Sequence, residues 1–205
     1  MTMRVRAIAL GWLLIVATSA GVAHAQPTAA EGRFRLAGTA GVAKLFRIED
    51  RSFGTTVNLG GEAGLRVFRR GWIVFEANRF VGLETDPAPC GLVDVTCTGG
   101  GRTGYDSATV GSMNLTYHFG DERVHVVVSG GFGFIRASGF ATTTFADGSQ
   151  VEREVNDQGW GPTAAVGFVV PFARGWSVDP TLRIYGADRP NLAAFRATLA
   201  MTRTW

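Results

Sequence analysis

The chain has 205 residues, of which 46% are hydrophobic and 18% charged, with 20 basic and 17 acidic side chains. Its 28 glycines are spread through alternating segments and it has only 7 prolines, which favours a regular all-β chain over a helical one. No apolar run after residue 25 reaches the roughly 20 residues of a transmembrane helix, so helical membrane proteins are excluded.

Residues 1–25 have the three regions of a secretory signal peptide. Arg4 and Arg6 form a basic start, an apolar run follows, and a small-residue cleavage motif ends at Ala25. The alternative, a membrane-spanning helix, is disfavoured because about fourteen apolar residues are too few to span a bilayer. We therefore predict that residues 26–205 form one exported domain. That domain keeps 18 basic against 17 acidic residues, a balance that gives no reason to expect a nucleic-acid partner.

Eight segments of this domain alternate between apolar residues and polar or small ones, the period of two that indicates β-strands. Their first apolar residues are Phe34, Val57, Ile73, Met113, Val124, Ala164, Trp176 and Phe195. In the last segment, 191–205, Phe195, Leu199 and Trp205 alternate with Arg196 and Thr198. A strand of about fourteen residues exceeds the five or six that are usual in soluble sheets, and it is long enough to cross a bilayer when tilted.

The connections alternate between tight turns and longer loops. Turns are expected at 69–71, 120–123 and 173–175, and loops near 46–54, 83–106, 137–159 and 187–192. This alternation and the even strand count predict an all-β fold, an eight-stranded antiparallel up-and-down transmembrane β-barrel. A soluble lipocalin-type barrel is the alternative. It is disfavoured because the face opposite the apolar one is too rich in glycine, threonine, serine and alanine to be a water-facing surface throughout.

Aromatic residues gather beside the expected tight turns and at the chain end. The six are Trp72, Tyr117, Phe119, Phe172, Trp176 and Trp205. Tryptophan and tyrosine prefer the boundary between water and lipid, where the ring is half buried and its polar group stays wet. We predict that the six lie at one level, the periplasmic boundary. Ordinary packing at hairpin ends is the alternative.

Charged residues collect at mid-strand on the polar face. They are Glu62, Arg66, Glu76, Asp179, Arg183 and Arg196. If the turn at 69–71 pairs Phe68 with Trp72, Glu76 lies diagonally between Glu62 and Arg66. Side chains just fill an eight-stranded barrel, and buried charges must be paired, so we interpret the six as an ion-paired plug in the lumen. A gate or a narrow solute path is the functional alternative.

Two further residue pairs are candidates for special chemistry. Cys90 and Cys97 lie close together in the second long loop and predict a disulfide, since two cysteines without a nearby histidine rarely bind a metal. If Phe119 pairs with Val124, His118 and His125 lie opposite each other on the lumen side. They either share a metal ion or are polar residues at a wet barrel mouth, and we favour the second. We assign no catalytic, cofactor or metal site.

These features together resemble the small outer-membrane β-barrel proteins of the OmpA, OmpX and OmpW type. The resemblance rests on the exported N-terminus, the eight amphipathic strands, the turn and loop alternation, the strand end Asn114-Leu115-Thr116-Tyr117-His118-Phe119 and the terminal Trp205. Closing strands of such barrels end on an aromatic that the barrel assembly machinery recognises. No peptidoglycan-binding domain is expected after Trp205.

The resemblance implies a monomer in the bacterial outer membrane, with the assembly machinery, membrane lipid and lipopolysaccharide as partners. Our first hypothesis is a non-enzymatic barrel whose exposed loops serve envelope integrity or surface interaction. The second is a narrow porin-like channel for small or hydrophobic solutes. The third, a lipid A-modifying enzyme, is disfavoured because no catalytic constellation is visible. The loops at 83–106 and 137–159 each contain four acids and one arginine, so we expect them to repel bare lipopolysaccharide phosphates unless divalent cations intervene.

Overall fold

A computed structural model describes residues 32–47, 51–83, 87–88, 101–120, 124–145, 148–188 and 191–205. The predicted signal peptide and both cysteines lie outside these residues. No helix in the described part of the chain is long and apolar enough to cross a membrane.

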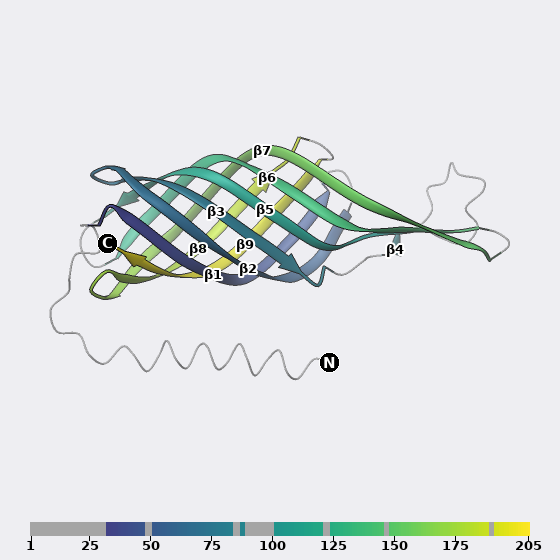
Figure 1. Ribbon diagram of the computed structural model, residues 1–205, viewed down its shortest axis with the longest axis horizontal. Helices are drawn as coiled ribbons and strands as arrows, with labels where there is room; N and C mark the ends of the chain where they lie inside the picture. The colour runs from purple at the N-terminus through teal and green to yellow at the C-terminus, as the bar shows by residue number, and fades with distance from the viewer. Residues whose placement is uncertain are drawn as a thin grey trace.

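The described chain forms one closed antiparallel barrel (Figure 1). Its strands are β1 (Phe34–Arg47), β2 (Arg51–Phe68), β3 (Gly71–Val81), β5 (Gly101–Phe119), β6 (His125–Thr144), β7 (Gln150–Ala173), β8 (Trp176–Gly186) and β9 (Leu192–Thr204), with a two-residue strand β4 (Pro87–Ala88) beside β5. Each barrel strand pairs with its neighbours in the chain, skipping β4, and β1 pairs with β9. The predicted eight-stranded up-and-down barrel is confirmed.

The pairing of β1 with β9 closes the barrel. It runs from Arg35 opposite Thr204 to Arg47 opposite Leu192. Beyond it, the Trp205 amide donates to the Phe34 carbonyl at 3.0 Å, and the Trp205 carbonyl accepts from the Phe34 amide at 3.2 Å. The last residue of the chain therefore extends the closing ladder instead of leaving it open.

The outer face of the barrel is apolar. The alternating large residues point outward and are about half exposed, for example Leu36 at 54%, Leu115 at 51% and Leu199 at 55%. The residues between them, such as Thr116 and Thr198, are buried in the interior. This is the reverse of a soluble barrel, which buries its apolar face, and it is the arrangement that lipid requires. The lipocalin-type alternative is therefore wrong.

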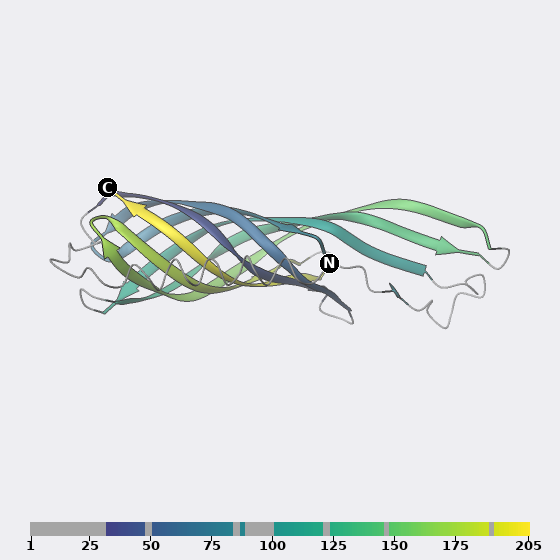
Figure 2. The same ribbon diagram turned by 90° about the horizontal axis from the view of Figure 1, so that it is seen from below.

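Three strands continue past the barrel on the loop side (Figure 2). β6 and β7 stay paired to Thr144 opposite Gln150, whereas β8 pairs with β7 only from Thr163 onward. β5 accompanies them, pairing with β6 as far as Gly101 opposite Thr143. We call residues 137–144 and 150–159 the loop-side ribbon.

Three loop predictions were therefore too long. Residues 137–159 are mostly strand, and β5 already begins at Gly101 within the loop expected at 83–106. The loop expected at 46–54 shrinks because β1 reaches Arg47 and β2 begins at Arg51. The ribbon has polar residues on both faces, since water surrounds it, and so lacks the alternation that identifies a half-buried strand.

The outward face yields a direct test at Leu115. We expect Leu115→Arg to lower the free energy of unfolding in lipid vesicles by about 2–4 kcal/mol, because an arginine in the lipid-facing band of a barrel is costly. Leu115→Ile, which keeps the site apolar, should change it by less than about 1 kcal/mol. Urea titration followed by tryptophan fluorescence measures both values. Equal stabilities would mean that β5 does not present Leu115 to lipid.

Candidate functional site

Glu76 on β3 lies at the centre of the lumen. Its carboxylate accepts hydrogen bonds from Arg196 Nη2 at 2.7 Å, from Ser112 Oγ at 2.9 Å and from the hydroxyl of Tyr185. Arg183 Nε lies 3.3 Å from the same carboxylate. The carboxylate is fully buried, so each of these donors replaces a water that it would otherwise bind. Four strands are thereby tied together across the interior.

Glu62 on β2 forms the second centre of charge. Arg35 Nη2 donates to it at 2.7 Å, and Arg196 Nη2 lies 3.9 Å from its other oxygen. Glu62 and Glu76 are direct cross-strand partners, where like charges repel. Arg196, fully buried between them, offsets this repulsion.

The predicted diagonal placement of Glu76 was wrong. A β-bulge between Arg66 and Phe68 shifts the hairpin register, so that Phe68 pairs with Gly71 and Arg66 with Trp72. An extra residue on one strand cannot be recognised from alternation alone.

The structure brings five of the six predicted lumen charges into the buried interior: Glu62, Glu76, Asp179, Arg183 and Arg196. Asp179 lies toward the turns, where its Oδ2 accepts from the Thr202 hydroxyl at 2.7 Å. Arg66 is half-buried, with its guanidinium 5.8 Å from the centre of the Trp72 ring, so it belongs to the turn-side mouth of the lumen. We call Arg35, Glu62, Glu76, Arg183 and Arg196 the ion-paired cluster.

Sequence reasoning missed two members of this site, Arg35 and Tyr185. Both lie on the inward face of their strands, Arg35 beside outward Phe34 and Tyr185 two residues after Arg183. Strict alternation was the signal that would have identified them. Arg35 forms the shortest ion pair of Glu62 among the described residues.

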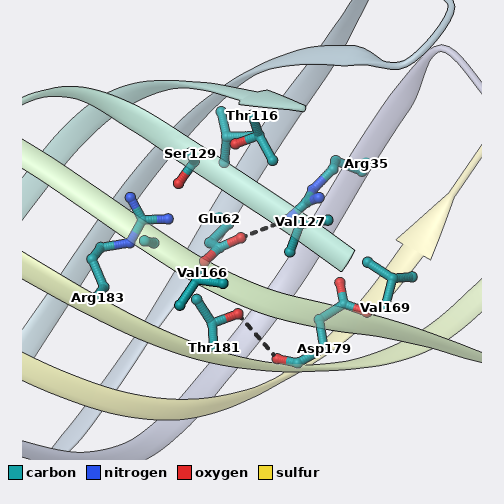
Figure 3. A pocket seen from close by; sticks show the side chains of 12 residues that line it. Arg35, Glu62, Thr116, Val127, Ser129, Val166, Val169, Asp179, Thr181 and Arg183 are labelled. Atoms are coloured by element: carbon teal, nitrogen blue, oxygen red, sulfur yellow. Dashed lines mark hydrogen bonds and ion pairs between the residues drawn. The ribbon is translucent and has the colours of Figure 1, made fainter. Parts of the chain in front are cut away.

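A small cavity borders the cluster on its turn side (Figure 3). Arg35 and Glu62 point toward each other there, and Asp179 and Arg183 also line the cavity. Several buried polar atoms at its rim have no hydrogen-bond partner among the described residues, including Ser129 Oγ and Asp179 Oδ1. Buried polar atoms of this kind bind water. The turn-side half of the lumen is therefore polar.

The loop-side half of the lumen is mostly apolar, although it also holds buried Asn58 and Thr56. A core of buried side chains fills it. These side chains come from β1, β3, β5, β6, β8 and β9, and two of them, Leu83 and Ala187, lie just after the ends of β3 and β8. It comprises Ala43, Leu45, Phe80, Leu83, Tyr105, Ala108, Val110, Ile135, Ala137, Tyr185, Ala187, Leu192 and Ala194. Leu45, Phe80 and Leu192 have no exposed surface. We call this set the loop-side core, and it closes the lumen above the ion-paired cluster.

Five of the predicted boundary aromatics lie at the turn end, and four of them are exposed on the outer surface. Trp205, Phe172 and Phe119 are about half exposed, at 54%, 51% and 48%, and Tyr117 is 38% exposed. Trp176 is partly buried beneath the guanidinium of Arg203, which lies 5.1 Å from its ring centre.

Trp72 does not join the other five aromatics. It is only 4% exposed and points into the lumen, because it lies on the same face of β3 as Val74 and Glu76. Its ring lies 6.2 Å from that of His118.

The register predicted for His118 and His125 was also wrong. β5 and β6 pair with Phe119 opposite Val126, so His118 pairs with Val127 and His125 with Val169 of β7. The two rings still approach, with centroids 6.3 Å apart. Among the described residues, no group of three or more His, Cys, Asp or Glu side chains forms a possible metal site. The disulfide between Cys90 and Cys97 stays a prediction.

Two proteins with solved structures share this fold. Neisserial surface protein A is 14% identical, over 84% of this chain and 97% of that one, with a TM-score of 0.57. Ail, the attachment invasion locus protein of Yersinia pestis, is 10% identical over 85% and 99%, with a TM-score of 0.51. A second structure of Ail holds the heparin analogue sucrose octasulfate, with 8% identity and a TM-score of 0.51. No family model matches the chain, and no curated protein matches it. The resemblance to small outer-membrane barrels is thus confirmed for the fold.

We expect a large loss of stability when Arg196, the cation that Glu62 and Glu76 share, is replaced. Arg196→Met should lower the free energy of unfolding in vesicles by about 3–5 kcal/mol, because it leaves Glu62 and Glu76 facing each other with too little compensation. Adding Glu76→Gln to this variant should recover part of the loss.

Arg69→Met serves as the control, since Arg69 is exposed in the turn after β2 and its replacement should cost less than about 0.5 kcal/mol. A loss below 1 kcal/mol for Arg196→Met would contradict the role assigned to the cluster.

Proposed function

We propose that the chain is a non-enzymatic integral protein of the bacterial outer membrane that serves envelope integrity or surface interaction. The observation that carries this proposal is the combination of a closed ladder with an apolar exterior. In hydrocarbon every backbone polar group needs an internal partner, and a closed barrel supplies one for each. The half-exposed leucines, valines and phenylalanines would be a liability in water.

The filled lumen argues against a channel. Solutes crossing the barrel would have to displace the loop-side core and then separate the short ion pairs of Glu76 and Glu62. Breaking a buried ion pair without replacing its partner costs several kcal/mol. The barrel is therefore better suited to hold its loop-side ribbon rigidly than to conduct.

The same packing supports a non-enzymatic role. General acid–base or nucleophilic work needs a side chain that can reach substrate. Glu76 accepts three hydrogen bonds and forms an ion pair with Arg183, and its carboxylate has no exposed surface. It acts as a structural anion.

The loop-side ribbon is the part suited to surface contact. Both of its faces are exposed, with Glu152 and Glu154 on one face of β7 and Val151 and Arg153 on the other. The fold neighbour Ail was solved with a polysulfated heparin analogue. A ribbon with an acidic excess repels such a polyanion, so we propose a cationic partner surface for this chain.

Orientation follows from the turn and loop lengths. Barrels of this class place short turns in the periplasm and long connections outside. We propose that the turn end, including Trp205, faces the periplasm and that the ribbon faces the medium. The assembly machinery, membrane lipid and lipopolysaccharide as partners, and the monomeric state, stay predictions.

Epitope insertion tests the location and the orientation together. A tag inserted after Gly148, at the tip of the ribbon, should be reached by antibody on intact cells, since exposed loop tips tolerate insertion. A tag inserted between Arg69 and Arg70 should be reached only after the outer membrane is permeabilised. Antibody access to the second tag alone on intact cells would overturn the orientation, and recovery of the protein in the soluble fraction would overturn the proposal.

Planar-bilayer recording tests the closed lumen. The refolded protein should give no stepwise conductance. The double variant Leu45→Ser and Phe80→Ser opens the loop-side core, so it should give a higher ionic conductance than the unaltered chain. Regular conductance steps from the unaltered chain would instead support the channel hypothesis.

A further inference from the structure

Two arginines lie in one row on the outer face of the barrel. Arg79 of β3 pairs with Thr109 of β5, and Thr109 pairs with Arg136 of β6. Both arginines are exposed, and Thr109 is partly exposed between them. Neighbouring strands are separated by about 4.8 Å, so the two arginine Cα atoms are roughly 10 Å apart. Their long side chains can converge on one group above Thr109.

The row lies at the loop-side boundary of the apolar band. Strands in such barrels tilt by about 35–45°, so each residue advances ~2.5 Å along the barrel axis. Counting from the first residues of β3 and β6, Arg79 and Arg136 lie roughly 20 and 27 Å above the turn end. The apolar band of an outer-membrane barrel is about 25 Å tall. Arg136 therefore lies at the loop-side edge of this band, and the long side chain of Arg79 can extend to the same level.

Apolar rows lie directly below on the same strands. The next row toward the turns pairs Ala77, Gly111, Phe134 and Trp160, and the one after pairs Phe75, Met113 and Phe132. Phe132 stacks on Trp160 with ring centroids 6.3 Å apart, and Phe134 lies 5.3 Å from the same indole.

Gly111 makes room for this aromatic layer. A Cβ at Gly111 would come within 2.4 Å of the Phe134 ring, so glycine is what allows the ring to lie flat over β5. Trp160 is 55% exposed, as expected for an indole at a water–lipid boundary. The surface thus changes from apolar to aromatic to basic along the barrel axis, which is the profile of a lipid from acyl chain to phosphate.

The two arginines remain available for an anion. Arg136 Nε donates to Asn156 Oδ1 at 3.2 Å, which orients the side chain, and its terminal nitrogens make no hydrogen bond to a described residue. Neither arginine forms an ion pair with a described residue. On β3, β5 and β6, no acidic residue lies in the row or in the two rows directly below it. The nearest described acids are Asp157, which accepts from the Tyr105 hydroxyl, and Asp188, whose Oδ1 accepts from the Trp160 amide at 3.4 Å.

We propose that Arg79, Thr109 and Arg136 bind the phosphate group of a membrane lipid whose acyl chains lie against Phe75, Met113 and Phe132. Two guanidinium groups and a hydroxyl supply donors that match phosphate oxygens. This proposal rests on the membrane location proposed above. It also revises the expectation that lipid phosphates are repelled, because the acids of the ribbon lie above the basic row and not within it.

Lipid retention by the refolded full chain in detergent tests the proposal, with native mass spectrometry counting bound lipids. The probes are diphosphoryl lipid A, its dephosphorylated form, phosphatidylglycerol and inorganic phosphate. The double variant Arg79→Gln and Arg136→Gln should bind diphosphoryl lipid A about tenfold more weakly than the unaltered chain. The matched control, Arg69→Gln and Arg174→Gln, removes two exposed arginines at the turn end and should bind as the unaltered chain does.

Each probe gives a decisive outcome. The site is supported if the unaltered chain binds a phosphorylated lipid more tightly than dephosphorylated lipid A and the double variant does not. The phosphorylated lipid that binds more tightly identifies the class of lipid that supplies the phosphate. Equal binding by the double variant and the unaltered chain overturns it. Displacement by inorganic phosphate at an equal concentration also overturns it, since the apolar rows would then contribute nothing. The heat-induced gel shift of each variant reports folding separately, so failure of the membrane proposal is distinguishable from failure of this site.

Discussion

The closing ladder between β1 and β9 is the constraint on which the rest of the molecule depends. Each backbone polar group left open to hydrocarbon costs several kcal/mol, so an eight-stranded sheet with two free edges would be untenable in lipid. Closure puts the alternate side chains of every strand into one narrow interior. The charges on that inner face must then pair with one another, which explains why Arg196 comes to lie between Glu62 and Glu76.

The interior that results has three layers. Polar atoms and a small cavity occupy the turn side, the ion-paired cluster crosses the middle, and the loop-side core fills the remainder. Tyr185 joins two of these layers, because its hydroxyl donates to Glu76 while its ring packs with the core. Such a filled interior resists deformation and supports the strands that continue outward as the loop-side ribbon. The outer surface, graded from apolar through Trp160 to Arg136, matches the membrane in which we propose it sits.

Alternation carried most of this information in the sequence. The strand count, the outward face and the inward position of Glu62, Glu76, Asp179, Arg183 and Arg196 follow from a period of two, because each strand has one face in lipid and one in the lumen. Register did not follow. One extra residue near Val67 placed Glu76 opposite Glu62, and no local pattern marks such a bulge.

The ribbon and the basic row were missed for different physical reasons. The ribbon has water on both sides, so it has no apolar face to detect. Arg79 and Arg136 are 57 positions apart in the chain and meet only through the pairing of each with Thr109. Relations of this kind exist only once three strands are aligned.

Electrophoresis of the refolded protein in SDS, with and without boiling, tests the central claim of a closed barrel most directly. A closed ladder with a packed interior should resist SDS and migrate as a compact species until it is heated, after which it should run at the 21.8 kDa expected for the extended full-length chain. Removal of Trp205 together with Arg203 and Thr204, which shortens the β1–β9 ladder, should lower the temperature of that shift. A single band at the same position before and after boiling would contradict the closed barrel.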